Sequence, residues 1–228
     1  MIISAVLFLL PGAVPGLQAQ VRLKDPGFPA RESITYLKTS ERGSEFVQVE
    51  MRLVDDIEKP HYEYRLESES RDILARLSAD TLHVYYSEVR EKNEHSTVHK
   101  INKVVRNEKR IGPGELLMTD VNGFDVSVRG FPWDTEEYAR LVFLNDNGAD
   151  RFKLELKVRG RDTLKLNGSS YECWKVQIGL DGILGTLFPK SYYWYSAAPP
   201  HFLVRVENSG MGGVEESVME IRSYSAGY

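Results

Sequence analysis

The 228-residue chain has only one cysteine, Cys173, so no disulfide can form within it. It also lacks a basic excess, because 29 Lys and Arg stand against 33 Asp and Glu and the formal net charge is -4. Binding to a phosphate backbone needs a dense basic surface, and no run of aromatic residues alternates with Lys or Arg. We therefore expect no nucleic-acid partner. At 42% hydrophobic and 27% charged residues, the composition is that of a globular protein whose core alone stabilises it.

The motifs of common catalytic sites are missing too. There is no Gly-x-Ser-x-Gly, no phosphate-binding Gly-rich loop ending in Lys-Ser/Thr, and no His-Glu-x-x-His. His95 and His99 lie in a charged segment that is typical of a solvated turn rather than a metal site. His201 would pair with Asp181 and Cys173 only if the fold brought them together, so a hydrolase stays a minor alternative. The sequence indicates no catalytic residue, no metal and no cofactor.

A long hydrophobic run is also absent. Residues 1–19 carry no charge, and the apolar run 2–10 ends at Pro11, Gly12, Pro15 and Gly16. A membrane-spanning helix needs roughly 20 apolar residues, whereas the core of a signal peptide needs about 7 to 15. We interpret residues 1–19 as a signal peptide cut after Leu17-Gln18-Ala19, although no basic residue follows Met1. The expected location is periplasmic or secreted, with residues 20–228 as a single β-rich domain. The alternative, a buried N-terminal strand, conflicts with two prolines and two glycines.

The rest of the chain alternates apolar and polar residues with a period of two, which is typical of antiparallel strands. In the clearest case Phe152, Leu154, Leu156 and Val158 alternate with charged residues. Residues 119–133 fit either a short helix ending at Arg129 or a strand. No helical period of ordinary length occurs, which excludes a parallel α/β fold. The predicted strands are 33–39, 47–53, 62–66, 82–89, 97–105, 138–144, 152–159, 171–178, 191–196, 202–206 and 218–224.

Most predicted strands have one apolar and one charged face, so the sheet must cover a single apolar surface with very little helix. We predict a mainly β protein, a strongly curled antiparallel sheet or half-open barrel of about ten strands with at most a short helix. A barrel of more than roughly eight strands is too wide for side chains alone to fill, so an apolar cavity is expected. A two-sheet sandwich with a filled core fits the pattern equally well.

The segment 179–201 differs from the other connections. Gly179, Gly182 and Gly185 lie among the apolar residues of the loop, which is therefore either buried or an exposed patch with a partner. The strand that follows places Tyr192 and Trp194 on one face and two further tyrosines on the other. Aromatic side chains on both faces indicate a groove or the mouth of a cavity, or else a strand covered on both sides.

The region 152–206 contains most of the residues that this chain shares with a known kind of protein. They are Asn167-Gly168-Ser169-Ser170-Tyr171-Glu172-Cys173-Trp174-Lys175-Val176, the loop 179–190 and the strands 194–204, together with Arg129-Gly130-Phe131-Pro132. The region resembles an uncharacterised domain-of-unknown-function family of exported bacterial mostly-β proteins. The family often has Pro-Ala-Gly-Thr where this chain has Leu166-Asn167-Gly168-Ser169. The resemblance implies an envelope location and a curled sheet similar to lipoprotein carriers of the LolA/LolB type, which cup acyl chains. It implies no catalytic residues.

These observations lead to two functional hypotheses. The first is an exported envelope protein that binds an apolar small molecule, lipid or acyl chain in its curled sheet. The alternative is a non-enzymatic module that docks onto an envelope protein through the apolar loop 182–188. Peripheral contact with a membrane is compatible with both. The predicted ligand-binding residues are Phe131, Trp133, Trp174, Leu184, Phe188 and Trp194.

Overall fold

The computed structural model describes residues 20–56, 59–92, 98–102, 111–144, 151–182, 185, 188–210 and 215–227; the side chains of 98–102, 144, 151 and 152 are not described. Three features predicted from the sequence lie outside these ranges: the signal peptide 1–19, His95 and Leu184. The same holds for the side chain of His99. Within the described residues, no helix has the length and apolar character needed to cross a membrane.

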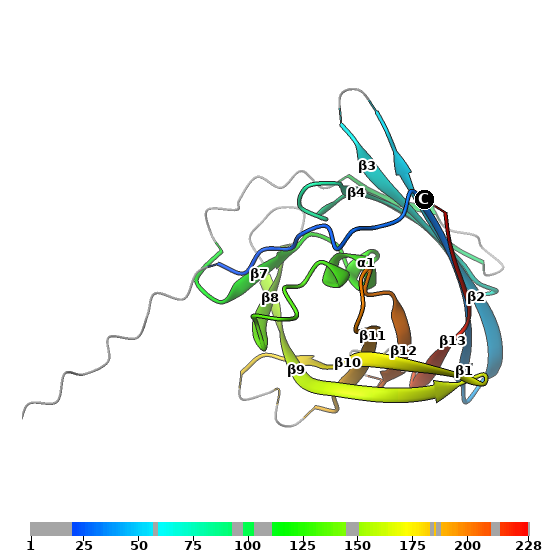
Figure 1. Ribbon diagram of the computed structural model, residues 1–228. Helices are drawn as coiled ribbons and strands as arrows, with labels where there is room; N and C mark the ends of the chain where they lie inside the picture. Colours follow the sequence, from blue (N-terminus) through cyan, green and yellow to red (C-terminus); the bar gives the residue numbers. More distant parts are fainter. Residues whose placement is uncertain are drawn as a thin grey trace, which may run out of the picture.

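The described strands form one sheet that curls into a barrel-like ring (Figure 1). Its thirteen strands run in the order β6-β5-β4-β3-β2-β1-β13-β12-β11-β10-β9-β8-β7, so β6 and β7 are the two edges. The predicted curled, mainly β architecture is confirmed, and the single sheet excludes the two-sheet sandwich. The strands are β1 Arg31–Ser40, β2 Gly43–Val54, β3 His61–Glu67, β4 Arg71–Ser78, β5 Val84–Glu91, β6 Val98–Asn102, β7 Glu115–Met118, β8 Tyr138–Leu144, β9 Arg151–Leu166, β10 Ser169–Leu180, β11 Ser191–Ser196, β12 Leu203–Asn208 and β13 Ser217–Gly227.

Because the pattern has a period of two, every second side chain of a strand points into the ring. In β4, Ile73, Ala75 and Leu77 are buried while their neighbours are more exposed. The β9–β10 hairpin turns at Asn167 and Gly168, both with positive φ (52° and 78°), which is the conformation that an Asn-Gly pair favours in a tight hairpin. Every strand pair is antiparallel except β7 with β8, which is parallel.

The parallel pair requires a crossover, and this crossover fills the ring. It contains the helix α1 (Phe124–Arg129), which lies inside the barrel (Figure 1). The ambiguous segment 119–133 therefore contains a helix and not a strand. A helix of six residues has no stability of its own in water, so its burial must hold it in place. At Gly130 a Cβ would come within 2.4 Å of the carbonyl oxygen of Lys24, which leaves no space for a side chain.

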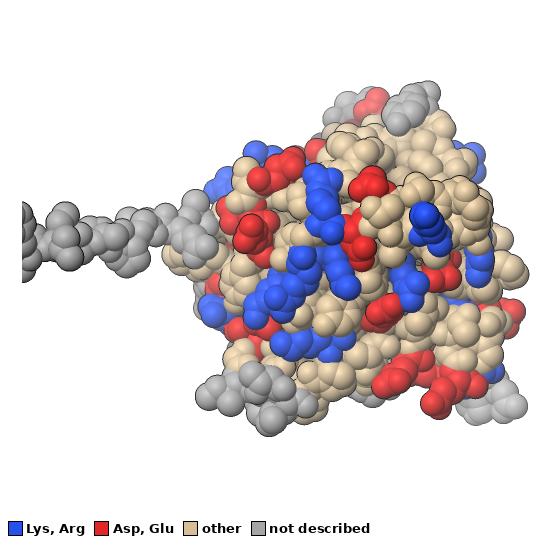
Figure 2. Space-filling model, turned by 60° about the horizontal axis from the view of Figure 1, so that its bottom comes forward, with Lys and Arg blue, Asp and Glu red and all other residues tan. Residues whose placement is uncertain are grey.

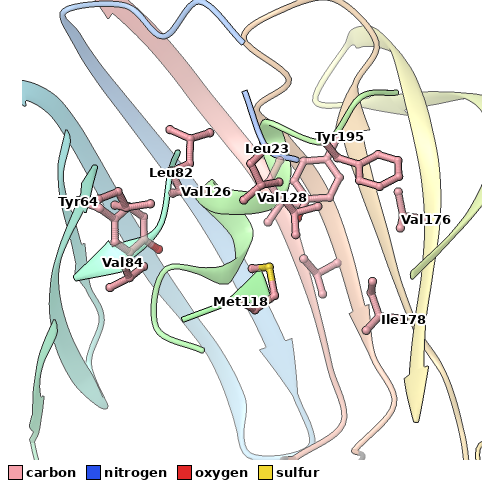
Figure 3. Packing of buried hydrophobic residues seen from close by; sticks show 14 of the residues in the cluster. Leu23, Tyr64, Leu82, Val84, Met118, Val126, Val128, Val176, Ile178 and Tyr195 are labelled. Atoms are coloured by element: carbon pink, nitrogen blue, oxygen red, sulfur yellow. The ribbon is translucent and has the colours of Figure 1, made fainter. Parts of the chain in front are cut away.

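The core is packed around α1. Figure 3 shows Val126 and Val128 of the helix between Tyr64 and Val84 on one side and Tyr195 on the other. Val21 and Leu23, from the segment before β1, join the same cluster, and the amide of Lys24 donates to the carbonyl of Gly130. In the described part of the chain, this helix and its flanking residues occupy the space that the strand count suggested for an apolar cavity.

Candidate functional site

Aromatic side chains gather at one end of the barrel, which we call the mouth: the end where β11 leads into β12 and residues 130–135 follow α1. The Trp133 ring centroid lies 5.1 Å from Phe131, 6.3 Å from Trp174 in a stacked arrangement, and 5.3 Å from Tyr195. The His201 ring meets Trp133 edge-on at 6.0 Å. The fold thus brings three of the predicted ligand-binding residues, Phe131, Trp133 and Trp174, into one cluster.

A cleft of about 280 Å³ opens beside this cluster. Ligand pockets have volumes of roughly 300 to 1,000 Å³, so the cleft lies at the lower limit of this range. Its wall combines apolar surface with charged groups at the rim, of which the Asp134 side chain is 88% exposed. The lining residues are Lys24, Asp25, Pro26, Arg129, Gly130, Phe131, Pro132, Trp133, Asp134, Thr135 and His201.

One side of the cleft is fixed by the turn between β11 and β12. His201 has a φ of +54°, which is uncommon for a residue other than glycine, and its Nδ1 lies 2.9 Å from the carbonyl oxygen of Ser196. Because a carbonyl only accepts, Nδ1 carries the hydrogen of this bond. Burial lowers the pKa of His201 below its ordinary value, so the ring is neutral at neutral pH. The imidazole therefore presents an uncharged face to Trp133.

The base of the cleft is a buried ion pair. The Arg129 guanidinium binds both carboxylate oxygens of Glu32, with Nη2 to Oε2 at 2.8 Å, and its Nε donates to the carbonyl of Pro200 at 2.9 Å. The two side chains are 3% and 0% exposed. Burial works against the charge of Arg129, but the Glu32 carboxylate outweighs it and raises the pKa of Arg129. The Arg129 guanidinium is thus already neutralised by Glu32. It stabilises the base of the cleft and is not available to bind a charged ligand.

Behind Trp133 an aromatic column continues into the barrel. Tyr195 stacks on Tyr193 with centroids 6.4 Å apart, and Tyr193 meets Phe124 of α1 at 5.9 Å. The Tyr195 hydroxyl is buried and has no hydrogen-bond partner among the described residues. Nearby, the partly buried Asp125 accepts a hydrogen bond from the Tyr64 hydroxyl at 3.2 Å, and desolvation raises the pKa of Asp125. Sequence reasoning missed Asp125 and Glu32, because nothing in their local sequence distinguishes them from surface carboxylates.

The remaining predicted residues lie elsewhere. Trp194 is buried but points to the outer side of the sheet, where its Nε1 donates to Asp162 at 2.9 Å. Phe188 is 46% exposed and precedes β11, at the strand end away from the mouth. Leu184 is outside the described residues. The structure therefore does not gather all six residues at one place.

The residues considered for a hydrolase are not assembled either. Cys173 and Asp181 are separated by most of β10, which amounts to roughly 25 Å in an extended strand, so they cannot both reach His201. Asp181 pairs with Arg140 instead. Burial raises the pKa of the Cys173 thiol to about 12, which leaves almost no thiolate to act as a nucleophile at neutral pH.

No known family model matches the chain, and no curated protein matches it. Among solved structures, it is similar to a β-barrel-like protein of a domain-of-unknown-function family from Brucella abortus, with 6% identity, 87% of this chain and 98% of that chain covered, and a TM-score of 0.40. A protein of a second such family, from Desulfovibrio piger, has 9% identity, coverage of 88% and 87%, and a TM-score of 0.35. A candidate outer membrane lipoprotein-sorting protein domain from Vibrio parahaemolyticus has 8% identity, coverage of 86% and 85%, and a TM-score of 0.31.

These neighbours are the kinds of protein that the sequence resemblance named: mostly-β proteins of unknown function and a lipoprotein-sorting domain. With TM-scores of 0.40 and below, they say nothing of what this chain binds. Its ligand must be inferred from its own side chains.

Proposed function

We propose that the protein is an exported envelope protein that binds an apolar ligand, a lipid or acyl chain, in the cleft at the mouth of its barrel. The observation that supports this most directly is the aromatic cluster of Phe131, Trp133 and Trp174 beside a cleft of about 280 Å³. Ligand sites of this size are lined mainly by apolar and aromatic side chains, with a few polar groups that orient the ligand.

The distribution of polarity around the cleft favours an amphipathic ligand. Phe131 and Trp133 offer apolar surface within it, and each methylene that leaves water for such a surface gains roughly 0.8 kcal/mol. Lys24 and Asp134 stand among the lining residues and give polar partners to a headgroup. Because Arg129 is saturated by Glu32, Lys24 is the cation of this lining that is open to an acidic headgroup.

The aromatic column behind the cleft limits how far a ligand can reach. From Trp133 the rings of Tyr195, Tyr193 and Phe124 continue towards the centre of the barrel at spacings of 5.3 to 6.4 Å. These rings pack in the core, where Tyr195 is 1% exposed. The apolar part of a ligand would therefore lie against Phe131 and Trp133 and end at this column.

The test is native mass spectrometry of the protein purified without detergent from an exporting host, before and after incubation with laurate. We expect added mass that is lost on denaturation. Thr135→Trp, at the exposed rim, should obstruct the cleft and lower laurate affinity at least tenfold without loss of stability. Trp194→Phe is the matched control, because Trp194 lies on the outer side of the sheet. Equal affinity in all three proteins would refute a site in this cleft.

A second candidate function rests on Phe188, whose ring is 46% exposed next to Pro189 and Lys190. Contiguous exposed apolar patches mark contact surfaces, and along the chain Phe188 directly follows the apolar residues Ile183, Leu184 and Leu187. In this case the loop 182–188 docks onto an envelope protein and the sheet is its scaffold. Phe188→Ser should then abolish capture of that partner and leave bound acyl mass unchanged. If it removes the acyl mass instead, the docking function is wrong.

A further inference from the structure

The outer face of the wall formed by β8 to β11 carries an excess of positive charge. Figure 2 turns the wall at the bottom of Figure 1 towards the reader and shows Lys and Arg side chains gathered across it. The cations that lie on neighbouring positions of this face, which we call the cationic wall, are Arg140, Lys153, Lys157, Arg159, Lys175 and Lys190. The chain as a whole is acidic, so its positive charge is unevenly distributed.

Carboxylates beneath the wall are shared between cations and lie deeper than they do. Glu155 bonds both Lys157, at 2.9 Å, and Lys190, at 3.6 Å. Its side chain is 13% exposed, against 35% for Lys157. Glu115, which is 9% exposed, pairs with Lys153 at 2.5 Å and with Arg140 at 3.9 Å. Arg140 pairs more closely with Asp181, at 2.7 Å, whose side chain is 21% exposed. The surface that meets solvent is therefore formed mainly by the cations.

Two cations of the wall are held by uncharged groups. Arg159 donates from Nε and Nη2 to the side-chain oxygen of Gln177. The Lys175 ammonium lies 5.2 Å from the Tyr192 ring centroid and 5.0 Å from that of Trp194. These contacts orient the charges without neutralising them. The excess of positive charge does not continue beyond β11, because Arg205 of β12 forms ion pairs with both Glu207 and Glu220.

We infer that the cationic wall docks the protein on the surface of an anionic lipid bilayer. The charges lie on β8, β9 and β10 and at Lys190 just before β11, and they form a broad face rather than a pocket. The Arg159 fork is already committed to Gln177, so it is not open to the bidentate pairing that a defined carboxylate of a protein partner would use. A broad positive face is complementary to the broad negative surface of an anionic bilayer. Each basic residue near that surface raises the affinity of the protein for the bilayer roughly fivefold. Tyr192, beneath Lys175, is partly exposed and belongs to a residue type enriched at membrane interfaces.

The test is sedimentation of the full chain with vesicles of equal parts phosphatidylglycerol and phosphatidylcholine, compared with phosphatidylcholine alone. Binding should need the anionic lipid and fall steeply between about 50 mM and about 500 mM salt, because salt screens exposed charges. The variant Lys157→Gln, Arg159→Gln, Lys175→Gln should bind about a hundredfold more weakly. The control Arg31→Gln, Arg65→Gln, Arg90→Gln makes the same change in net charge on exposed residues of β1, β3 and β5, and should bind like the unaltered protein.

Two results would overturn the inference. Equal losses in both triple variants would mean that net charge alone matters and that the wall is no docking face. Retention on a polyglutamate resin with no binding to anionic vesicles would assign the wall to an acidic protein partner. The control changes three exposed residues, and the wall variant changes exposed Arg159 and the partly exposed Lys157 and Lys175, so the thermal melting of both should match that of the unaltered chain. Laurate binding in the cleft is independent of the wall, so the two proposals fail separately.

Discussion

The two faces of β11 carry similar side chains in different surroundings. Tyr193 and Tyr195 point into the barrel, stack on each other and continue the aromatic column from Trp133. Tyr192 and Trp194 point outwards and lie beneath Lys175, with Arg205 a further cation over Trp194. The strand thus places aromatic rings on a desolvated side and on a charged side. Residue type alone therefore does not distinguish a ligand-binding aromatic residue from one at the surface. The side chains that surround it on the neighbouring strands make this distinction.

Ion pairs differ between the two faces in the same way. Inside, Arg129 and Glu32 are almost fully buried, and each leaves the other uncompensated if it is removed. Outside, Lys157 and Glu155 are partly hydrated, so either can turn to water when its partner is lost. The comparison predicts that removing one member of the buried ion pair lowers the free energy of unfolding more than removing one member of the outer pair.

The largest effect is expected from Arg129→Met, which leaves a buried carboxylate at Glu32. The free energy of unfolding in urea should fall by about 3 to 5 kcal/mol. Lys157→Met makes the equivalent change on the outer face and should cost at most about 1 kcal/mol, as for a solvent-screened pair.

A double variant separates the buried charge from lost packing. Arg129→Met combined with Glu32→Gln should recover much of the stability, because no unpaired charge is left in the core. A double variant as unstable as Arg129→Met alone would show that the guanidinium acts through its contacts with Pro200 and the Phe28 ring.

A second effect comes from Asp125 inside the barrel. Burial raises the pKa of this carboxyl in the folded chain above 3.8, so its protonated form is favoured by folding. The associated stability is fully present below the unfolded pKa and is lost as the pH rises through the folded value. Asp125→Asn should thus be close to neutral below the unfolded pKa of 3.8 and should stabilise the chain increasingly as the pH rises from there through the folded pKa. Urea unfolding across this pH range measures it, and a difference independent of pH would contradict the raised pKa.

Most of the sheet could be predicted because burial in it follows the period of two. Where the pattern is weak, prediction failed. In β4, Leu74 takes an outward position and breaks the apolar-polar alternation, so this strand was not predicted. In β7 all four residues are buried, which gives no alternation at all. The helix inside the ring was one of two interpretations, since Val126 and Val128 are two apart and both are buried by the surrounding barrel.

The site was harder to predict than the sheet. Phe131 and Trp133 reach the mouth through the crossover after α1, whose path is not readable from spacing, whereas Trp174 faces inwards in alternation with Val176 and Ile178 of β10. Alternation correctly placed Trp194 and Tyr195 on opposite faces, but it did not say which face is inside. Glu32 alternates with buried residues of β1, so its position was compatible with burial, yet its partner Arg129 is 97 residues away.

A smaller effect on stability is expected at two tyrosine hydroxyls inside the barrel, those of Tyr64 and Tyr195. Tyr64 donates to Asp125, so Tyr64→Phe leaves a partly buried carboxyl short of a donor and should cost about 1 to 3 kcal/mol. The Tyr195 hydroxyl has no partner among the described residues, so Tyr195→Phe should be neutral or slightly stabilising. Thermal and urea unfolding of both variants measure this difference. A similar loss in Tyr195→Phe would indicate that its hydroxyl is satisfied by ordered water.

The smallest effect is expected on the outer face, at the hydrogen bond from Trp194 to Asp162. This bond lowers the pKa of Asp162, so it adds stability that is present above the unfolded pKa of 3.8 and is lost as the pH falls through the lower folded value. Trp194→Phe removes the donor, and water can replace it because Asp162 is only partly buried. The loss should be about 0.5 to 1.5 kcal/mol at pH 7 and should shrink below pH 4. Carbon-detected NMR titration of Asp162 in both proteins would show its pKa rise in the variant, and an unchanged pKa would refute the role of this bond.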